Sequence, residues 1–482
     1  MPKTLEGFIN DLKRVAPEEI IEVKREVDPK FEATTLLRKL ELEDRRPMVI
    51  FRNPKNLKGE RSLFPLTFNT FATRKKLAIA LGLDPSNYKM GLTFAIRDRY
   101  KTPIKPVTLR EEEAPVKEVK RVGHEVDLLD LPIPTHHAKD GGPFILGASL
   151  VLKDPDTGSY NVALIRLHVK GKNRTLNHAE PRHHTGIILK KYLDQGKPCP
   201  FVAVIGHHPS FYLGSQWVGP YGQNEYDIIS SALGEPLRLV PSETLGKDFL
   251  VPADAEMILE GHILPGEKEE EGPVGEHTRY YKTIKGETIE KVLESPTKIT
   301  AITHRKRAYY QSVFIGHSEH GLISSVPIEA VIFEKIRSFT PGVKAVHLTP
   351  AGCCRYICYI SMKQKMEGEA KDAILGAFPV DYHLKYVIVV DDDVDVFNDS
   401  EVLWALSTRT QPQRDTFIIP EAMGSRLDPT VGSDSRAPLT SRMGIDATKP
   451  IVQPFSEVCE VPLDLLERIR IEDYIEDRKK PR

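Results

Sequence analysis

The sequence contains little cysteine: five residues in a chain of 482, too few for a disulfide framework. Cys353, Cys354 and Cys358 lie close together, but no second cluster completes a four-ligand zinc site, so buried reduced thiols are expected. No apolar run approaches the roughly 18 residues that span a bilayer, and the N-terminus carries no hydrophobic signal core. We therefore expect a cytoplasmic protein without a membrane span.

An excess of charge of either sign is also missing. Lys and Arg number 67 and Asp and Glu number 68, which gives a formal net charge of −1. A protein that binds nucleic acid through bulk charge needs an excess of Lys and Arg, so no nucleic-acid partner is expected. The sequence has no P-loop, no GxGxxG after a strand, no GxSxG and no HExxH. An ordinary dinucleotide-binding enzyme, serine hydrolase or zincin is therefore unsupported.

Periodicity divides the chain into parts, and its length allows about three domains. Helical and strand patterns alternate through residues 1–108, which predicts an N-terminal α/β domain. Short strand-like runs separated by turn residues predict a β-rich domain over 109–300, for which a barrel is one arrangement. The alternation returns over 301–455, which predicts a C-terminal α/β domain. Residues 463–475 predict an amphipathic helix that docks on a partner subunit, within the terminal segment 456–482.

A first candidate for chemistry lies in the predicted strand over residues 161–170. Asn161 and Arg166 flank an apolar run there. Residues five apart in a strand point to opposite faces unless a bulge intervenes. Taken alone, the pattern is most simply a polar residue at a strand start and a solvated arginine.

A second candidate is a cluster of four potential ligands within seven residues, namely His178, Glu180, His183 and His184. A polar surface turn is the simpler interpretation. The functional interpretation is metal or anion binding, with His184 at the start of a helix predicted over 186–193, where backbone N–H groups favour a phosphate.

A third candidate is a pair of carboxylates, Glu271 and Glu276, that bracket a Gly-Pro-x-Gly turn. Such a turn can hold the two groups rigidly near one another. If both face a closed pocket, the pKa of one should rise, so that this group can act as a general acid at neutral pH. The other can pair with an arginine and stay ionised. The acidic run 267–271 is otherwise most simply a solvated loop.

In combination, these residues resemble the UbiD family of reversible decarboxylases, which use prenylated flavin mononucleotide (FMN). The resemblance extends over most of the chain and rests on the order and spacing of several motifs. They include Asn161-x4-Arg166, His184-x-Gly186, Asn224-Glu225-Tyr226, Glu271-Gly-Pro-x-Gly-Glu276-His277-Thr278 and Lys385-x-Val-Ile-Val-Val-Asp391. The resemblance implies an N-terminal α/β domain, a central split β-barrel akin to flavin reductases, and a C-terminal α/β domain with a terminal dimerisation helix.

The resemblance also implies a cofactor site. Asn161, His184 and Glu225 are the expected ligands of Mn²⁺ or Mg²⁺, and their amide oxygen, imidazole and carboxylate suit a cation that neutralises a flavin phosphate. A K⁺ ion is expected beside it, near Ser215. The full set of expected contacts to the prenylated FMN is Asn161, Leu164, Ile165, Arg166, His183, His184, Ser215, Glu225 and Lys385.

Arg166, Glu271 and Glu276 match the catalytic set of the family. The resemblance implies that Arg166 pairs with Glu271 and orients the carboxylate of a small acid, while Glu276 donates the proton that replaces CO₂. The cofactor acts as the electron sink, and the acid is aromatic, heteroaromatic or α,β-unsaturated. A flavin prenyltransferase is the implied supplier of the cofactor, and a homodimer or homohexamer is the implied assembly.

The sequence departs from the family pattern beside Glu276. Arg279 stands where many members have glycine, and His277 occupies a position that faces the substrate in relatives. We therefore expect both residues in the substrate pocket and a substrate with a second polar or anionic group. The alternative is that Arg279 points to solvent and pairs with the acidic run 267–271.

Two other functions stay open from the sequence alone. One is a flavin-binding or carrier subunit without its own activity, and the other is a metal-dependent hydrolase built on the histidine cluster. The intact Arg166, Glu271 and Glu276 argue against the carrier. Dependence of activity on flavin or on metal alone separates the three.

Overall fold

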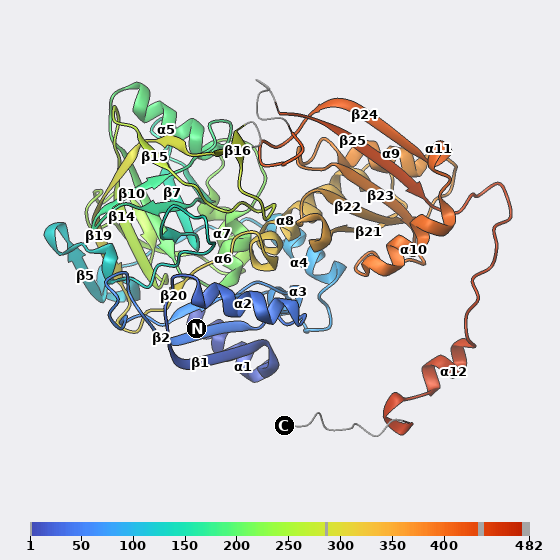
Figure 1. The fold of residues 1–482 in the computed structure, drawn as a ribbon, viewed down its shortest axis with the longest axis horizontal. Helices are drawn as coiled ribbons and strands as arrows, with labels where there is room; N and C mark the ends of the chain where they lie inside the picture. Colours follow the sequence, from blue (N-terminus) through green and yellow to red (C-terminus); the bar gives the residue numbers. More distant parts are fainter. Residues whose placement is uncertain (1, 285–287, 432–437, 475–482) are drawn as a thin grey trace.

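Alternating helices and strands build the first part of the chain in a computed structural model that describes residues 2–284, 288–431 and 438–474 (Figure 1). Leu5, Phe8, Ile9 and Leu12 form the buried face of the first helix, and the Thr4 hydroxyl caps it by accepting from the Gly7 N–H. The elements are α1 (Leu5–Val15), β1 (Ile20–Val27), α2 (Glu32–Leu42), β2 (Met48–Pro54), β3 (Leu66–Phe68), α3 (Arg74–Ala80) and α4 (Met90–Tyr100).

The middle of the chain forms a nine-stranded sheet coiled into a half-barrel. Its strand order is β6-β9-β10-β19-β14-β11-β7-β8, and β5 pairs with β19 off this path. All of the pairs are antiparallel. The strands are β5 (Val119–Val122), β6 (Phe144–Ile145), β7 (Ala148–Lys153), β8 (Tyr160–Leu164), β9 (Leu167–Val169), β10 (Arg174–Asn177), β11 (Cys199–Ile205), β14 (Met257–Ile263) and β19 (Pro296–His304).

Helices and small sheets surround this half-barrel. The helix expected over 186–193 is present and begins slightly earlier, at His184. The acidic run expected to be a solvated loop instead ends in a strand whose last residue, Glu271, is fully buried. The elements are β4 (Val107–Thr108), α5 (His184–Asp194), α6 (Pro209–Ser215), α7 (Glu225–Leu233), β12 (Arg238–Pro241), β13 (Leu250–Pro252), β15 (Glu269–Glu271), β16 (Thr283–Ile284), β17 (Thr288–Ile289) and β18 (Val292–Glu294).

A five-stranded sheet with helices on both faces forms the last large part, in the order β21-β22-β23-β25-β24. One apolar cluster packs the sheet against α8 and α9, and a second packs its other face against α10. The elements are α8 (Ser318–Arg337), β21 (Val343–Leu348), β22 (Ile357–Met362), α9 (Glu369–Ala377), β23 (Tyr386–Asp391), α10 (Asp399–Arg409), α11 (Pro412–Asp415), β24 (Thr416–Met423) and β25 (Leu439–Ala447). The predicted α/β multidomain fold class is thus confirmed.

Two features connect the three parts: a strand from later in the chain that joins the N-terminal sheet, and a buried ion pair. The short strand β20 (Tyr310–Gln311) pairs with β3 and completes the N-terminal sheet, although it follows the half-barrel in sequence. Arg74 on α3 donates to the Glu329 carboxylate on α8 at 2.8 Å, and the Glu329 side chain is fully buried. Strand β19 runs to His304, past the expected domain boundary at residue 300.

The terminal segment departs from its expectation. The helix expected over 463–475 is shorter in the structure, where α12 spans only Leu463–Arg468. Leu463 and Leu466 of this helix are exposed, and the segment runs away from the rest of the molecule (Figure 1). A helix this short gains little stability without packing, which explains its early end.

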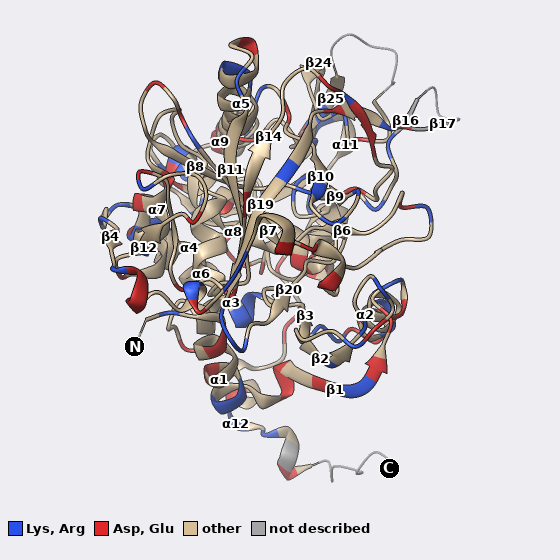
Figure 2. Ribbon diagram, turned by 90° about the vertical axis from the view of Figure 1, so that its left-hand side faces the viewer, with Lys and Arg blue, Asp and Glu red and all other residues tan. Residues whose placement is uncertain are grey.

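Two further features concern the molecule as a whole. In Figure 2, Lys and Arg are interleaved with Asp and Glu around the described part of the chain, as the balanced composition predicts. Within that described part, no helix combines the length and the apolar character that a membrane crossing requires.

Candidate active site

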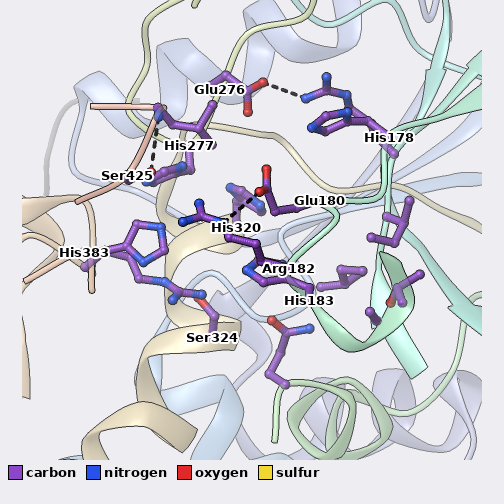
Figure 3. A pocket seen from close by; sticks show the side chains of 18 of the residues that line it. His178, Glu180, Arg182, His183, Glu276, His277, His320, Ser324, His383 and Ser425 are labelled. Carbon is purple, nitrogen blue, oxygen red and sulfur yellow. Dashed lines mark hydrogen bonds and ion pairs between the residues drawn. The ribbon is translucent and has the colours of Figure 1, made fainter. Parts of the chain in front are cut away.

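A cavity of about 1110 Å³ opens where the half-barrel meets α5, α6, α8 and the C-terminal sheet. Its lining includes Arg166, Glu271 and Glu276, as well as all three residues expected to bind a divalent cation. Figure 3 shows His178 on the side of the half-barrel, and His383 and Ser425 on the side of the C-terminal part. This volume is sufficient for a cofactor and a small substrate together.

Arg166 reaches this cavity because the strand predicted over 161–170 is interrupted. Strand β8 ends at Leu164 and β9 begins at Leu167, so Ile165 and Arg166 lie in a break between them. The break changes the alternation of faces, and Asn161 and Arg166 both line the cavity. The sequence pattern alone left this arrangement open.

Glu271 and Glu276, which lie at the two ends of one turn, both contact Arg166. Arg166 Nε and Nη2 donate to the two Glu271 oxygens at 2.8 and 2.9 Å, which is a bidentate pair. Its Nη1 donates to Glu276 Oε1 at 2.6 Å (Figure 3). Burial acts to lower the pKa of Arg166, but Glu276 and Glu271 outweigh it and hold the pKa above its usual value. The guanidinium therefore stays charged between two carboxylates.

A second loop holds the turn that separates the carboxylates. Asp140, whose side chain is fully buried, accepts from the Gly275 N–H at 3.0 Å and from the Tyr281 hydroxyl at 3.1 Å. The Gly141 N–H donates to the Pro273 carbonyl at 2.8 Å. A Cβ at Gly141 would lie 2.3 Å from the Gly272 oxygen, so only glycine permits this approach. The positions of Glu271 and Glu276 thus depend on residues about 130 positions earlier.

Asn161, His184 and Glu225 converge at one corner of the cavity. The Asn161 amide nitrogen donates to Glu225 Oε1 at 2.8 Å, and His184 Nδ1 lies 3.9 Å from the same oxygen. The Thr185 hydroxyl donates to Asn161 Oδ1 at 2.7 Å. An amide, an imidazole and a carboxylate within this range form a donor set that fits Mn²⁺ or Mg²⁺. A helix start adds backbone N–H groups, since α5 begins at His184.

The four-residue ligand cluster expected from the sequence does not converge on one point. His178 pairs with Glu294 at 2.7 Å, Glu180 pairs with Arg182, and His183 lies 3.4 Å from the Tyr382 hydroxyl. All four of its members nevertheless line the cavity.

The remaining expected contacts divide into two groups. Leu164, Ile165, His183 and Ser215 line the cavity, and so does His277. Lys385 and Arg279 are not part of its lining among the described residues. Lys385 Nζ lies 2.8 Å from Asp428 Oδ2, and Arg279 is exposed beside Gly316 with a φ of 64°.

The sequence reasoning missed a polar wall contributed by α8 and the C-terminal part. Arg355, Asp381, His320 and His383 line the cavity there, near His277. Burial is the largest cause that lowers the pKa of His277 well below its usual value, and it lowers the pKa of His320 to about 4. The only sequence cue was the position of Asp381 and His383 just before Lys385 in a recognised motif.

Comparison with known proteins assigns the family. Models of the N-terminal, Rift-related and C-terminal domains of 3-octaprenyl-4-hydroxybenzoate carboxy-lyase match residues 13–90, 107–318 and 322–447. The anhydromevalonate phosphate decarboxylase of Methanothermobacter thermautotrophicus is 32% identical over 434 residues, which cover 90% of this chain and 95% of that protein. The chain belongs to the UbiD family of decarboxylases.

Solved structures of this family have the same fold. The UbiD-class enzyme HmfF from Pelotomaculum thermopropionicum, in complex with FMN, superimposes with a TM-score of 0.88 at 36% identity, covering 98% of this chain and 100% of that one. An evolved dimeric form of HmfF in complex with prenylated FMN gives a TM-score of 0.85 at 34% identity, again covering 98% and 100%. The family and the reaction class that the sequence predicted are thereby confirmed.

Proposed function

We propose that this UbiD-family decarboxylase binds prenylated FMN and reversibly removes CO₂ from an aromatic, heteroaromatic or α,β-unsaturated carboxylic acid. The observation that carries the proposal is the Glu271–Arg166–Glu276 set at a cavity that Asn161, His184 and Glu225 also line. When bound, prenylated FMN supplies the electron sink for the electron pair that CO₂ leaves behind. The protein supplies orientation, charge and a proton.

The cofactor would be held at its phosphate end. Asn161, His184 and Glu225 would bind Mn²⁺ or Mg²⁺, which neutralises the phosphate, and Ser215 would lie near a K⁺ ion. Leu164, Ile165 and His183 would line the flavin. Lys385 stays a prediction, because its ammonium group pairs with Asp428.

Arg166 and Glu276 would perform the proton chemistry. Glu271 fixes the guanidinium plane through two hydrogen bonds, so that Arg166 can orient the carboxylate of the acid. After the C–C bond breaks and CO₂ departs, the carbon that carried it needs one proton. Glu276 Oε1 accepts from Arg166, so Oε2 is the oxygen that would donate this proton. In the carboxylation direction Glu276 would remove the same proton.

The proposed function implies two kinds of partner: a supplier of the cofactor and further copies of this chain. A flavin prenyltransferase would supply the cofactor. A homodimer or homohexamer would cover apolar side chains of residues 452–474 that are exposed in the single chain. They are Val452, Phe455, Val458, Val461, Leu463, Leu466, Ile469, Ile471 and Tyr474.

The cofactor assignment can be tested without knowing the substrate. Protein co-expressed with a flavin prenyltransferase should contain a flavin with the added prenyl mass, by absorption and mass spectrometry. Glu225→Gln should lower both flavin occupancy and bound Mn²⁺, while Glu276→Gln should retain both. Colourless protein, even when supplied with prenylated FMN and Mn²⁺ without oxygen, would contradict the proposal. Hydrolysis that depends on metal and not on flavin would favour the hydrolase instead.

A further inference from the structure

The polar wall of the cavity contains an arginine that one carboxylate holds in place. Arg355 Nη1 donates to Asp381 Oδ2 at 2.9 Å, and the Asp381 carboxylate is almost fully buried. The other Asp381 oxygen accepts from the His383 backbone N–H at 2.9 Å and lies 2.7 Å from His383 Nδ1. No second carboxylate within the described ranges forms an ion pair with Arg355. Its remaining N–H donors are therefore available to a ligand in the cavity.

Two further imidazoles adjoin this pair with unused polar atoms. The ring of His277 lies 5.6 Å from that of His383 and 6.5 Å from that of His320, centroid to centroid. His277 Nε2 and His320 Nδ1 are buried and have no hydrogen-bond partner in the described part of the chain. Buried polar atoms without a partner are uncommon, and in a cavity wall they mark a place for a ligand.

This wall is built from other elements than the corner that would hold the cofactor phosphate. Asn161, His184 and Glu225 belong to β8 and the starts of α5 and α7, whereas Arg355 and His383 belong to loops of the C-terminal part. His277 directly follows Glu276, the expected proton donor. The wall thus adjoins the expected proton donor in the lining of the same cavity.

We infer that Arg355, oriented by Asp381, binds a second anionic group of the substrate together with His383 and His277. The inference rests on the proposed decarboxylase function and names its substrate class: a small dianion whose reacting carboxylate contacts Arg166 and whose second charge contacts Arg355. That second group is a carboxylate or a phosphate, since both match the planar donor fork of an arginine.

The inference assigns the second charge to a residue that the sequence did not indicate. Arg279, the cation expected from the sequence, is exposed and lies outside the described lining of the cavity. The two arginines therefore form a matched pair of positions for a test. One is held in the wall by a buried carboxylate, and the other is at the surface.

Binding to protein loaded with unmodified FMN tests the inference without turnover. Calorimetric titration would use benzoate, terephthalate and 4-phosphonobenzoate as probes. We expect terephthalate or 4-phosphonobenzoate to bind at least ten-fold tighter than benzoate, and the tighter of the two identifies the source of the charge. Arg355→Met should bring this preference close to one, and Arg279→Met should leave it unchanged.

A second variant guards against a folding defect, since Arg355→Met leaves Asp381 without its arginine. His383→Gln keeps that ion pair, and it should reduce the preference at least three-fold at unchanged flavin content. Equal binding of benzoate and the dianions by the unaltered protein, or an undiminished preference in both variants, would overturn the inference. Failure of the proposed function would be distinguishable, because it would abolish CO₂ release from every acid while this binding preference persisted.

Discussion

At the scale of single residues, the site depends on one buried guanidinium. Arg166 satisfies Glu271, which has no exposed surface, and also contacts Glu276. Removing one partner of a buried ion pair leaves the other partner charged and unsolvated. The free-energy cost of that unpaired charge exceeds the stabilisation that the intact pair provides. Arg166 therefore has two roles that substitutions can separate, one in stability and one in orienting an acid.

Arg166→Met should lower the free energy of unfolding by about 3 kcal/mol, because the buried Glu271 carboxylate loses the guanidinium that pairs with it. Arg166→Lys should cost less stability, since a charge remains. Both variants should release CO₂ at least about 100-fold more slowly. Methionine leaves no cation to orient the acid, and the ammonium group of lysine lacks the planar donor fork of arginine. Urea unfolding and CO₂ release measure the two effects. Full activity in Arg166→Lys would show that the fork geometry is unnecessary.

Some residues of the site could be predicted from the sequence, and others could not. The motifs predicted that Arg166, Glu271 and Glu276 act together, and the structure brings them within hydrogen-bond distance. The strand break at Ile165 could not be predicted, because an unbroken apolar run resembles one continuous strand. Arg355 was missed since it comes from a turn with no motif, and its role arises only when distant segments meet.

At the scale of elements, the carboxylate loop depends on the loop before β6. The Asp140 carboxylate accepts from the Gly275 N–H, and the Gly141 N–H donates to the Pro273 carbonyl, so these two residues hold the Gly272–Gly275 turn. The sequence predicted the turn and its rigidity, but not its support, because a contact between loops this far apart leaves no periodic pattern. Loop support of this kind determines whether two catalytic side chains meet.

Gly141→Ala should displace the turn, because the new Cβ would lie 2.3 Å from the Gly272 oxygen. We expect kcat for CO₂ release to fall at least about ten-fold, since small displacements of catalytic groups are costly, while flavin content stays unchanged. The control is Gly171→Ala in the β9–β10 turn, where a Cβ meets nothing within 4 Å. Equal activity of the two variants would show that this close approach does not position the carboxylates.

The terminal helix α12 is shorter than its amphipathic pattern predicts. An amphipathic pattern over 463–475 predicts a helix, but α12 ends at Arg468. Amphipathic helices derive most of their stability from a packed apolar face, and Leu463 and Leu466 of this segment are exposed. The amphipathic pattern therefore indicates a surface that a partner would cover, and it does not by itself fix the length of the helix.

At the scale of the whole molecule, several buried histidines couple folding to pH. Burial lowers the pKa of His136 to about 3 and that of His207 and His320 to about 4. The unfolded chain has ordinary histidine pKa values near 6.5, so between pH 6.5 and 4 it binds more protons than the folded protein. Stability from these groups is present above pH 6.5 and is lost as the pH falls through that window.

The free energy of unfolding should therefore decrease steadily from pH 6.5 to 4. His207→Asn should reduce this slope by about 1.4 kcal/mol per pH unit, the contribution of one titrating group. Asparagine keeps an acceptor for the His208 N–H, which His207 Nδ1 accepts at 2.8 Å. Urea unfolding at several pH values measures the slope. An unchanged slope would mean that His207 titrates normally in the folded state.

One comparison tests whether Arg166, Glu271 and Glu276 act together as a decarboxylation site. The unaltered protein and Glu276→Gln, both loaded with prenylated FMN and matched for flavin content, would be assayed for CO₂ release from a panel of aromatic, heteroaromatic and α,β-unsaturated acids. We expect CO₂ release by the unaltered protein and a loss of at least about 100-fold in the variant, which cannot donate the proton. Equal release by both proteins, or no release from any acid by fully loaded protein, would contradict it.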